Sequence, residues 1–208
     1  MKSVYGIFKK IRSDSVRRSL ERKAQKNLKN DNFTLISNNC MAGMIYHNLS
    51  LQFTSPSINL WIGETPADYI KFLKNLDYYL NSELNFIHDG CDKYPRAYLG
   101  DVKIGFVHFK TETQARESWN KRINRIIPDR IWIIAYYENG VSKEEYVEIK
   151  SLGFKNAVII ADDSKSVRFC DVKLKKTERE HEWYSADKSG VRVFEKYFDY
   201  VEFLNTNS

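Results

Sequence analysis

The chain has 208 residues, 42% of them hydrophobic and 29% charged, with a formal net charge of +6 at pH 7. This balance is that of a globular protein with its own core, which excludes a disordered chain and a small disulfide-dependent scaffold. The three cysteines are far apart and form no C-x-x-C pair, and no run approaches the ~20 apolar residues that span a bilayer. We therefore expect a cytoplasmic protein without a disulfide framework or zinc knuckle.

The whole positive excess lies in residues 1–31, which hold ten Lys and Arg against three Asp and Glu. Four apolar residues recur there at helical spacing: Val4, Ile7, Phe8 and Ile11. We therefore predict a basic amphipathic helical extension, followed by a single domain at residues 32–208. Such a helix can lie on an anionic membrane surface, or its apolar face can pack on the domain or a second subunit. No nucleic-acid-binding module accompanies the charge, so we do not expect a nucleic-acid partner.

Strand and helix patterns alternate along the rest of the chain. They predict strand 33–37, helix 40–48, strand 57–62, helix 66–81, strands 84–88 and 103–109, helix 111–126, strand 130–137, helix 142–151, strand 156–161, a helix-like stretch 189–198 and a short strand 200–204. Thr65, Pro66 and Asp68 form the start signal of the helix at 66–81. This order is typical of an α/β fold with a mainly parallel sheet flanked by helices, in a Rossmann-like three-layer arrangement.

Polar residues gather at the predicted carboxyl ends of the strands, where open α/β sheets bind their ligands. Five strands are followed by or end in such residues: Ser37, Asn38, Asn39 and Cys40; Glu64; His108; Glu138 and Asn139; and Asp162 and Asp163. Loops are polar in any case, which accounts for Glu138 and Asn139. Cys40 and His108 are not typical loop residues, so we expect a site at this edge of the sheet.

Cys40 precedes a predicted helix, whose dipole would lower the pKa of the thiol and favour a nucleophilic thiolate. Asn38 or Asn39 would cap that helix or donate hydrogen bonds to the substrate. A pair between Cys40 and His108 is then conceivable. The alternative is that the two Asn only cap the helix, and that the cysteine and the histidine are packing residues.

In the predicted helix 111–126, Trp119 and Arg122 share a face and together would hold a ring and a phosphate, unless Trp119 simply packs on the sheet. No glycine-rich nucleotide-binding or phosphate-binding motif is present, so the sequence names no cofactor. The acidic pair Asp162-Asp163 and the stretch DGCD at 89–92 would suit a divalent cation. Neither is specific, and we predict no metal site.

Four segments resemble the bacterial family catalogued as Domain of Unknown Function 1919: ISNNCMAGMIYHNLSLQFTSP, DYIKFLKNLDYYL, YPRAYLGDVKIGFVHF and ARESWNKRINRI. The resemblance runs from about residue 33 to about residue 204 and leaves out the basic N-terminus. The family pattern falls on Asn38, Asn39, Cys40, Gly43, Tyr46, Ser55, Pro56, His108, Trp119 and Arg122. The resemblance implies a role in exopolysaccharide or capsule biosynthesis, where transferases act on lipid-linked intermediates.

The leading hypothesis is a transferase in surface-polysaccharide assembly that acts on a sugar or sugar phosphate at the cytoplasmic membrane face. Ser37, Asn38 and Asn39 would bind an anionic group at the helix N-terminus, and His108 would be the general base. Trp119 would stack on a ring, Arg122 would neutralise phosphate, and Asp162 would complete the substrate site. The alternatives are a Cys40–His108 acyl-transfer or hydrolytic enzyme and a non-catalytic capsule-assembly adaptor.

Overall fold

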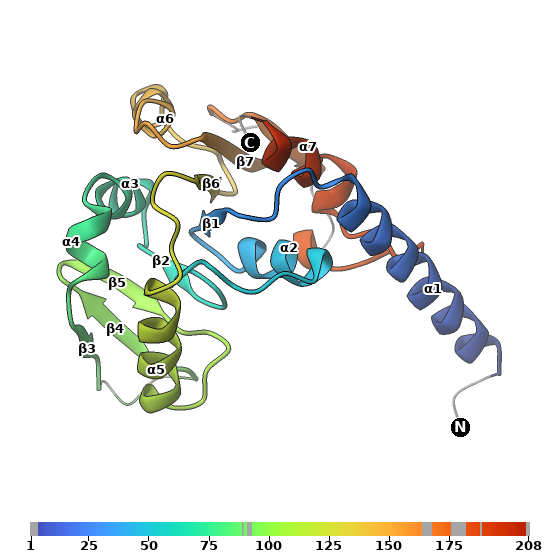
Figure 1. The fold of residues 1–208 in the computed structure, drawn as a ribbon, viewed down its shortest axis with the longest axis horizontal. Helices are drawn as coiled ribbons and strands as arrows, with labels where there is room; N and C mark the ends of the chain where they lie inside the picture. Colours follow the sequence, from blue (N-terminus) through green and yellow to red (C-terminus); the bar gives the residue numbers. More distant parts are fainter. Residues whose placement is uncertain are drawn as a thin grey trace.

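A computed structural model describes residues 4–88, 90, 93–163, 168–175, 182–187 and 189–206; the side chains of residues 4–12, 163 and 182 lie outside the description. These residues form an α/β structure with two four-stranded sheets and surrounding helices (Figure 1). The predicted α/β class is therefore confirmed.

The first sheet is parallel and has the order β1-β6-β7-β8. Its strands are β1 (Thr34–Ser37), β6 (Ile131–Tyr136), β7 (Asn156–Asp163) and β8 (Val172–Lys175). Alternate residues of β6 belong to two apolar clusters, with Ile133 in one and Ile134 in the other. Both faces of the central strands are therefore covered, which explains why β6 is an apolar run without alternation, and every residue of β1 is buried as well. No pattern had predicted β8.

The second sheet is antiparallel, with the order β2-β5-β4-β3. Its strands are β2 (Trp61–Ile62), β3 (Leu84–Phe86), β4 (Arg96–Leu99) and β5 (Val102–Gly105). A tight turn joins β4 to β5 at Gly100, whose φ of 60° suits glycine. The strand predicted at 103–109 therefore belongs to a hairpin and not to the parallel sheet, and it ends at Gly105. The predicted strand 57–62 shrinks to two residues.

Among the described residues, the helices beyond residue 40 are α2 (Met41–Leu49), α3 (Pro66–Lys74), α4 (Leu76–Leu80), α5 (Glu112–Ile123), α6 (Lys143–Lys150) and α7 (Tyr200–Asn205). Four of these six helices begin at a residue whose side chain caps them, namely α3, α5, α6 and α7, and the helix predicted at 66–81 is divided into α3 and α4. Thr65 and Asp68 form the predicted capping box of α3. The strand predicted at 200–204 is wrong, because Asp199 caps a helix by accepting the N–H groups of Val201 and Glu202. The stretch 189–198 contains only the 3₁₀ turn η2 (Phe194–Lys196), and another such turn, η1 (Glu182–Tyr184), precedes it.

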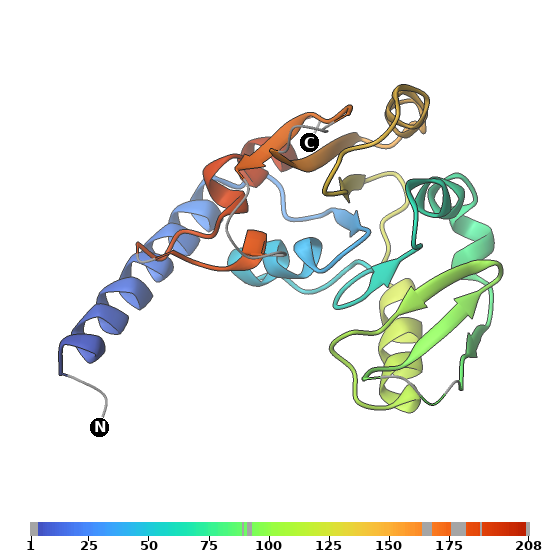
Figure 2. The same ribbon diagram turned by 180° about the vertical axis from the view of Figure 1, so that it is seen from behind.

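The predicted N-terminal helix is α1 (Val4–Asn27), and its beginning projects away from the rest of the fold in both views (Figures 1 and 2). Its later part is packed, since Ala24 is buried and Gln25 donates hydrogen bonds to the Asn48 carbonyl and to Ser50 Oγ. The apolar face at 4–11 lies among side chains outside the description. That residues 1–31 form a separable extension stays a prediction, but the contacts of Ala24 and Gln25 argue that this part of α1 belongs to the domain.

Asn38 continues the pairing of β1 with β6 beyond the last residue of β1. Its amide Nδ2 donates to the carbonyl of Tyr136 at 3.0 Å, and its Oδ1 accepts the Tyr136 N–H at 2.9 Å. The side chain is buried and therefore replaces the two backbone bonds of one more ladder position. Its place is that of a structural clamp at the edge of the sheet.

We predict that Asn38→Ala lowers the free energy of unfolding by about 2–4 kcal/mol, because it leaves two buried backbone groups of Tyr136 without partners. The measurement is urea unfolding followed by circular dichroism. Asn120→Ala, on the exposed side of α5, is the matched control and should change the value by less than about 0.5 kcal/mol. Indistinguishable curves for the two variants would contradict the clamp.

Candidate ligand-binding cleft

A cleft of about 1030 Å³ opens where the two sheets meet the C-terminal part of the chain. On the side of the parallel sheet it is lined by Asn38, Asn39 and Cys40 after β1, and by Tyr136 at the end of β6. The cleft therefore lies at the carboxyl edge of the parallel sheet, where open α/β sheets place their ligands. A site at that edge stays a prediction, and the cleft is the space in which it would lie.

Aromatic rings form much of the lining: Phe53, Trp61, Tyr94, Tyr136, Trp183 and Tyr184. The indole of Trp61 donates to the hydroxyl of Tyr94 at 3.2 Å, and it lies against Gly105. A Cβ on Gly105 would come within 2.2 Å of the ring, so only glycine permits this position of Trp61.

The Trp183 ring is held by contacts with one ring from β6 and one from its own segment. It contacts Tyr136 with centroids 5.7 Å apart, and Tyr184 edge-on at 5.5 Å. None of these rings was predicted from the sequence to belong to a site. Nothing in the local sequence marks them, because they converge only through the tertiary structure.

Besides the hydroxyls of its tyrosines and the thiol of Cys40, the polar side chains of the cleft are amides, imidazoles and one guanidinium. Asn39, Asn59, His47, His108 and Arg192 all line it, and none of its described lining residues is acidic. The Nδ2 atom of Asn39 is buried and has no hydrogen-bond partner among the described residues. A donor in this state favours a ligand that brings an acceptor. The cleft therefore suits a ring-bearing ligand that is neutral or negatively charged.

The turn between β1 and α2 is satisfied by its own side chains. Ser37 Oγ accepts the N–H of Ala42 at 3.1 Å, and Asn39 Oδ1 accepts the N–H of Met41 at 2.9 Å. Ser37 is fully buried and contributes no lining to the cleft. These bonds occupy backbone N–H groups at the start of α2, which the sequence analysis had predicted to bind an anionic ligand. The start of α2 is therefore a capped helix, and the anion-binding role predicted for this turn has no support in these bonds.

Cys40 and His108 line the same cleft, although they come from different sheets. Among the contacts of the described residues, no hydrogen bond joins the two. Burial raises the pKa of the Cys40 thiol to about 11, whereas the sequence had predicted a thiol acidified by the helix dipole. At neutral pH the thiol stays protonated, which removes the main argument for a nucleophile.

Three other predicted site residues lie outside the lining of the cleft. Trp119 belongs to α5 and is buried in the apolar cluster that this helix packs into. Arg122 donates to the Ile58 carbonyl at 2.7 Å and lies over the rings of Phe53 and Phe109, at 5.5 and 5.6 Å from their centroids. It therefore supports the cleft wall from behind Phe53. Asp162 is part of β7, where its charge adds to the burial that raises the pKa of Tyr136.

Only some of the residues considered as cation ligands lie within the described part of the chain. Asp89, Cys91 and Asp92 of the DGCD stretch, and the Asp163 side chain, lie outside the described residues. Within the described part of the chain, no three His, Cys, Asp or Glu side chains gather as metal ligands would.

Comparison with known proteins gives two matches. The family described as "Domain of unknown function (DUF1919)" matches residues 11–205. A relative named "Uncharacterized protein", from Haemophilus influenzae, is 30% identical over 205 residues, which cover 95% of this chain and 98% of the relative. The family match begins within α1, earlier than the resemblance seen in the sequence, and so it includes the packed part of that helix. In the described residues no helix has the length and apolar character to cross a bilayer.

We predict that Cys40 reacts slowly with iodoacetamide at pH 7.5, and that the rate rises about tenfold per pH unit up to at least pH 10, because only the thiolate reacts. The measurement uses a Cys91→Ser/Cys170→Ser variant and mass spectrometry. Glutathione is the control, since the pKa of an ordinary thiol is about 8.5 and its rate levels off above that pH. A Cys40 rate that levels off below pH 8 would instead mean an acidified, catalytic thiol.

Proposed function

This chain belongs to the family described as Domain of unknown function (DUF1919), and on that premise we propose that it is a transferase of surface-polysaccharide biosynthesis. Its substrate is a sugar or sugar phosphate, held in the aromatic cleft at the cytoplasmic face of the membrane. The observation that carries the proposal is the lining of the cleft, which combines six aromatic rings with amides and imidazoles.

That lining matches the chemistry of a sugar. The C–H faces of a pyranose stack on aromatic rings such as Trp61 and Trp183, while its hydroxyls accept from amides such as Asn39 Nδ2. The volume is at the upper end of the range for small-molecule sites, about 300–1,000 Å³, so it has room for a sugar nucleotide or the head of a lipid-linked sugar. Such a cleft also disfavours the adaptor hypothesis, which requires no site of this size.

His108 is the general base of the proposed reaction. It is exposed at the cleft and comes from the turn after β5. Its imidazole takes the proton from the acceptor hydroxyl as that oxygen bonds to the transferred group. The bond from this group to the donor phosphate breaks, and the phosphate leaves with the electron pair. Cys40 serves as part of the wall, in keeping with its raised pKa.

Membrane attachment is proposed through an exposed basic ridge on α1, formed by Arg18, Arg22 and Lys26 at intervals of four residues. Their guanidinium and ammonium groups have no carboxylate partner within the described residues, unlike Arg17 of the same helix. Each basic residue near an anionic surface contributes about 1 kcal/mol to binding.

We predict that at least one of a panel of nucleotide sugars and sugar 1-phosphates binds the protein in saturation-transfer NMR. Trp61→Ala should weaken that binding about tenfold, in line with the loss of one ring-stacking contact. Tyr98→Ala is the matched control, because Tyr98 is an exposed aromatic residue of β4 outside the cleft lining. Absence of binding across the panel, or equal effects of the two variants, would refute a sugar site.

The catalytic part of the same prediction uses His108→Gln. Turnover of the identified donor should fall by about 10²–10⁴, the usual contribution of a general base, with binding of the donor retained. His88→Gln is the control, since His88 is exposed and is not part of the cleft lining. Unchanged turnover in His108→Gln would assign the base to another residue.

For the membrane, we predict that Arg18→Glu/Arg22→Glu/Lys26→Glu lowers binding to phosphatidylglycerol vesicles at least about 100-fold, from the electrostatic contribution per residue. Co-sedimentation measures the effect. Lys110→Glu/Lys121→Glu/Lys143→Glu carries the same change of charge at exposed positions elsewhere and should bind nearly as the wild type does. Equal losses in the two variants would mean that net charge, and not the ridge, decides binding.

A further inference from the structure

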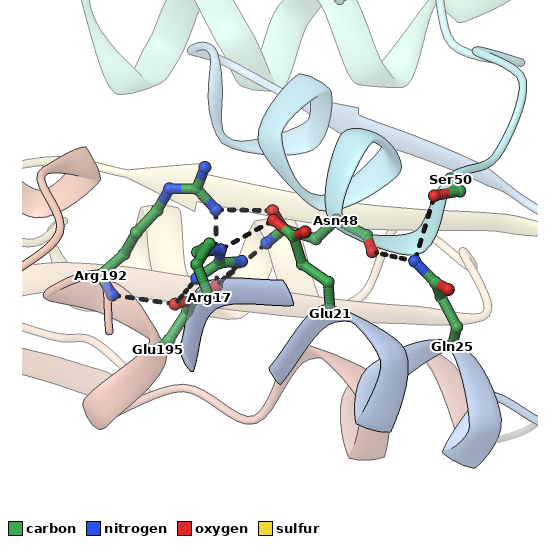
Figure 3. Close-up of polar contacts among 7 residues, drawn as sticks. All are labelled: Arg17, Glu21, Gln25, Asn48, Ser50, Arg192 and Glu195. Carbon is green, nitrogen blue, oxygen red and sulfur yellow. Dashed lines mark hydrogen bonds and ion pairs between the residues drawn. The ribbon is translucent and has the colours of Figure 1, made fainter. Parts of the chain in front are cut away.

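A largely buried group of charged and polar side chains connects α1, the end of α2 and the segment around η2; it is called here the Glu195 cluster and is shown in Figure 3. Its members are Arg17, Glu21, Asn48, Arg192 and Glu195. Arg17 donates through Nη1 and Nη2 to the two carboxylate oxygens of Glu195, and through Nε to Glu21 at 2.8 Å. The amide of Asn48 donates to Glu195 Oε1 at 2.9 Å.

The two guanidinium groups of the cluster are unequally neutralised. Arg17 has close bonds to both carboxylates, and these hydrogen bonds outweigh burial and raise its pKa. The Arg192 guanidinium donates to Asn48 Oδ1, and its ion pair with Glu195 is long, with Nη1 3.7 Å from Oε1. The backbone N–H of Arg192 donates to the other carboxylate oxygen, Glu195 Oε2, at 2.9 Å. In Figure 3 one terminal nitrogen of Arg192 carries no dashed line and points away from the cluster.

Arg192 also lines the cleft, and its side chain is only 18% exposed. A cation that is mostly removed from water, has one long ion pair and faces a cleft without a described acidic side chain favours an anionic partner. A guanidinium with free N–H donors suits the oxygens of a phosphate, which it can bind with two parallel bonds.

We propose that Arg192 is the receptor for a phosphate group of the cleft ligand, and that Arg17 positions it by engaging both carboxylate oxygens of Glu195, which leaves only a long ion pair between Glu195 and the Arg192 guanidinium. The proposal rests on the proposed function only for the nature of the rest of the ligand. A soluble sugar nucleotide and a lipid-linked sugar carry the same phosphate chemistry, so both would place this group at Arg192.

The role of Arg17 follows from competition for one carboxylate. Arg17 and Arg192 both form ion pairs with Glu195. Burial and then the charge of Arg17 lower the pKa of Arg192. Without the Arg17 guanidinium, the long ion pair between Glu195 and the Arg192 guanidinium would become a close one and draw that guanidinium from the cleft. The docking of α1 and the affinity of the cleft for anions are then coupled, and by linkage an anion in the cleft strengthens the docking of α1.

The first test measures the affinity for inorganic pyrophosphate by isothermal titration calorimetry on the full chain. Arg192→Gln should weaken binding at least tenfold, and Arg192→Lys, which keeps the charge without the planar fork, should fall between it and the wild type. Arg116→Gln, an exposed arginine of α5 outside the cleft, should stay within twofold. Thermal melts establish that each variant is folded. Wild-type affinity in folded Arg192→Gln would overturn the proposal.

The second test separates positioning from a general effect of charge. Arg17→Gln should weaken pyrophosphate binding three- to tenfold, although Arg17 is not part of the cleft lining. The double variant Arg17→Gln/Glu195→Gln should return to within twofold of the wild type, because no carboxylate then competes for Arg192. Lys23→Gln, at an exposed position of α1, is the charge-matched control. Equal losses in Arg17→Gln and Lys23→Gln, or no rescue in the double variant, would overturn the role of Arg17.

Two further probes, UDP-glucose and farnesyl pyrophosphate, separate failure of this proposal from failure of the proposed function. If both bind and Arg192→Gln weakens neither, the anion receptor is wrong and the sugar site stands. If pyrophosphate and farnesyl pyrophosphate bind through Arg192 while no sugar-bearing ligand binds, the receptor is supported and the transferase function is wrong. The tighter of the two phosphate ligands tells whether the group comes from a soluble or a lipid-linked donor.

Discussion

The parallel pairing of β1 with β6 is the constraint on which the rest of the structure depends. Both strands are covered on both faces, so their register is fixed by the apolar clusters above and below them. Asn38 extends that pairing through its side chain at the point where the backbone ladder stops. The turn that follows, with Asn39 and Cys40, therefore has a fixed position at the edge of the sheet, and the cleft is built on it.

The cleft exists because this rigid edge meets two other parts of the chain. The antiparallel sheet brings Trp61 over Gly105, and the C-terminal segment brings Trp183 against Tyr136. Gly43 lets α2 approach the segment before β2, since a Cβ there would lie 3.2 Å from Ile58. Two glycines and a few ring contacts thus decide the shape of a site whose aromatic members are distant from one another in the sequence.

Helix α1 carries charged residues in two different surroundings. The exposed basic residues of α1 face solvent, while Arg17 turns inward to the Glu195 cluster. The same helix therefore carries a surface that attracts anions and a buried contact that stabilises its docking. Arg192 donates to Asn48 of that cluster and also lines the cleft. The charge of Arg17 on α1 therefore acts on a residue of a cleft that α1 itself does not line.

Local signals in the sequence were sufficient for much of the secondary structure. The capping box at Thr65 and the apolar runs of β6 and β7 depend on neighbouring residues, and so they were predicted correctly. The hairpin of β4 and β5 and the last strand β8 were not, because pairing partners distant in the chain decide whether a short apolar segment becomes a strand. The segment of α7 was also predicted wrongly, because its apolar residues fit the spacing of a strand as well as that of a helix. The capping hydrogen bonds of Asp199 favour the helix.

The sequence by itself determined the α/β class and the polar turn after β1, whereas the edge predicted for His108 was wrong, because its strand belongs to the antiparallel sheet. Only the tertiary structure decided what the predicted site residues face. Burial set the protonation of Cys40, packing placed Trp119 in the core and Arg122 behind Phe53, and long-range contacts brought Trp183 and Arg192 to the cleft. The physical reason is that desolvation and charge pairing depend on distances in space, which one-dimensional spacing does not contain.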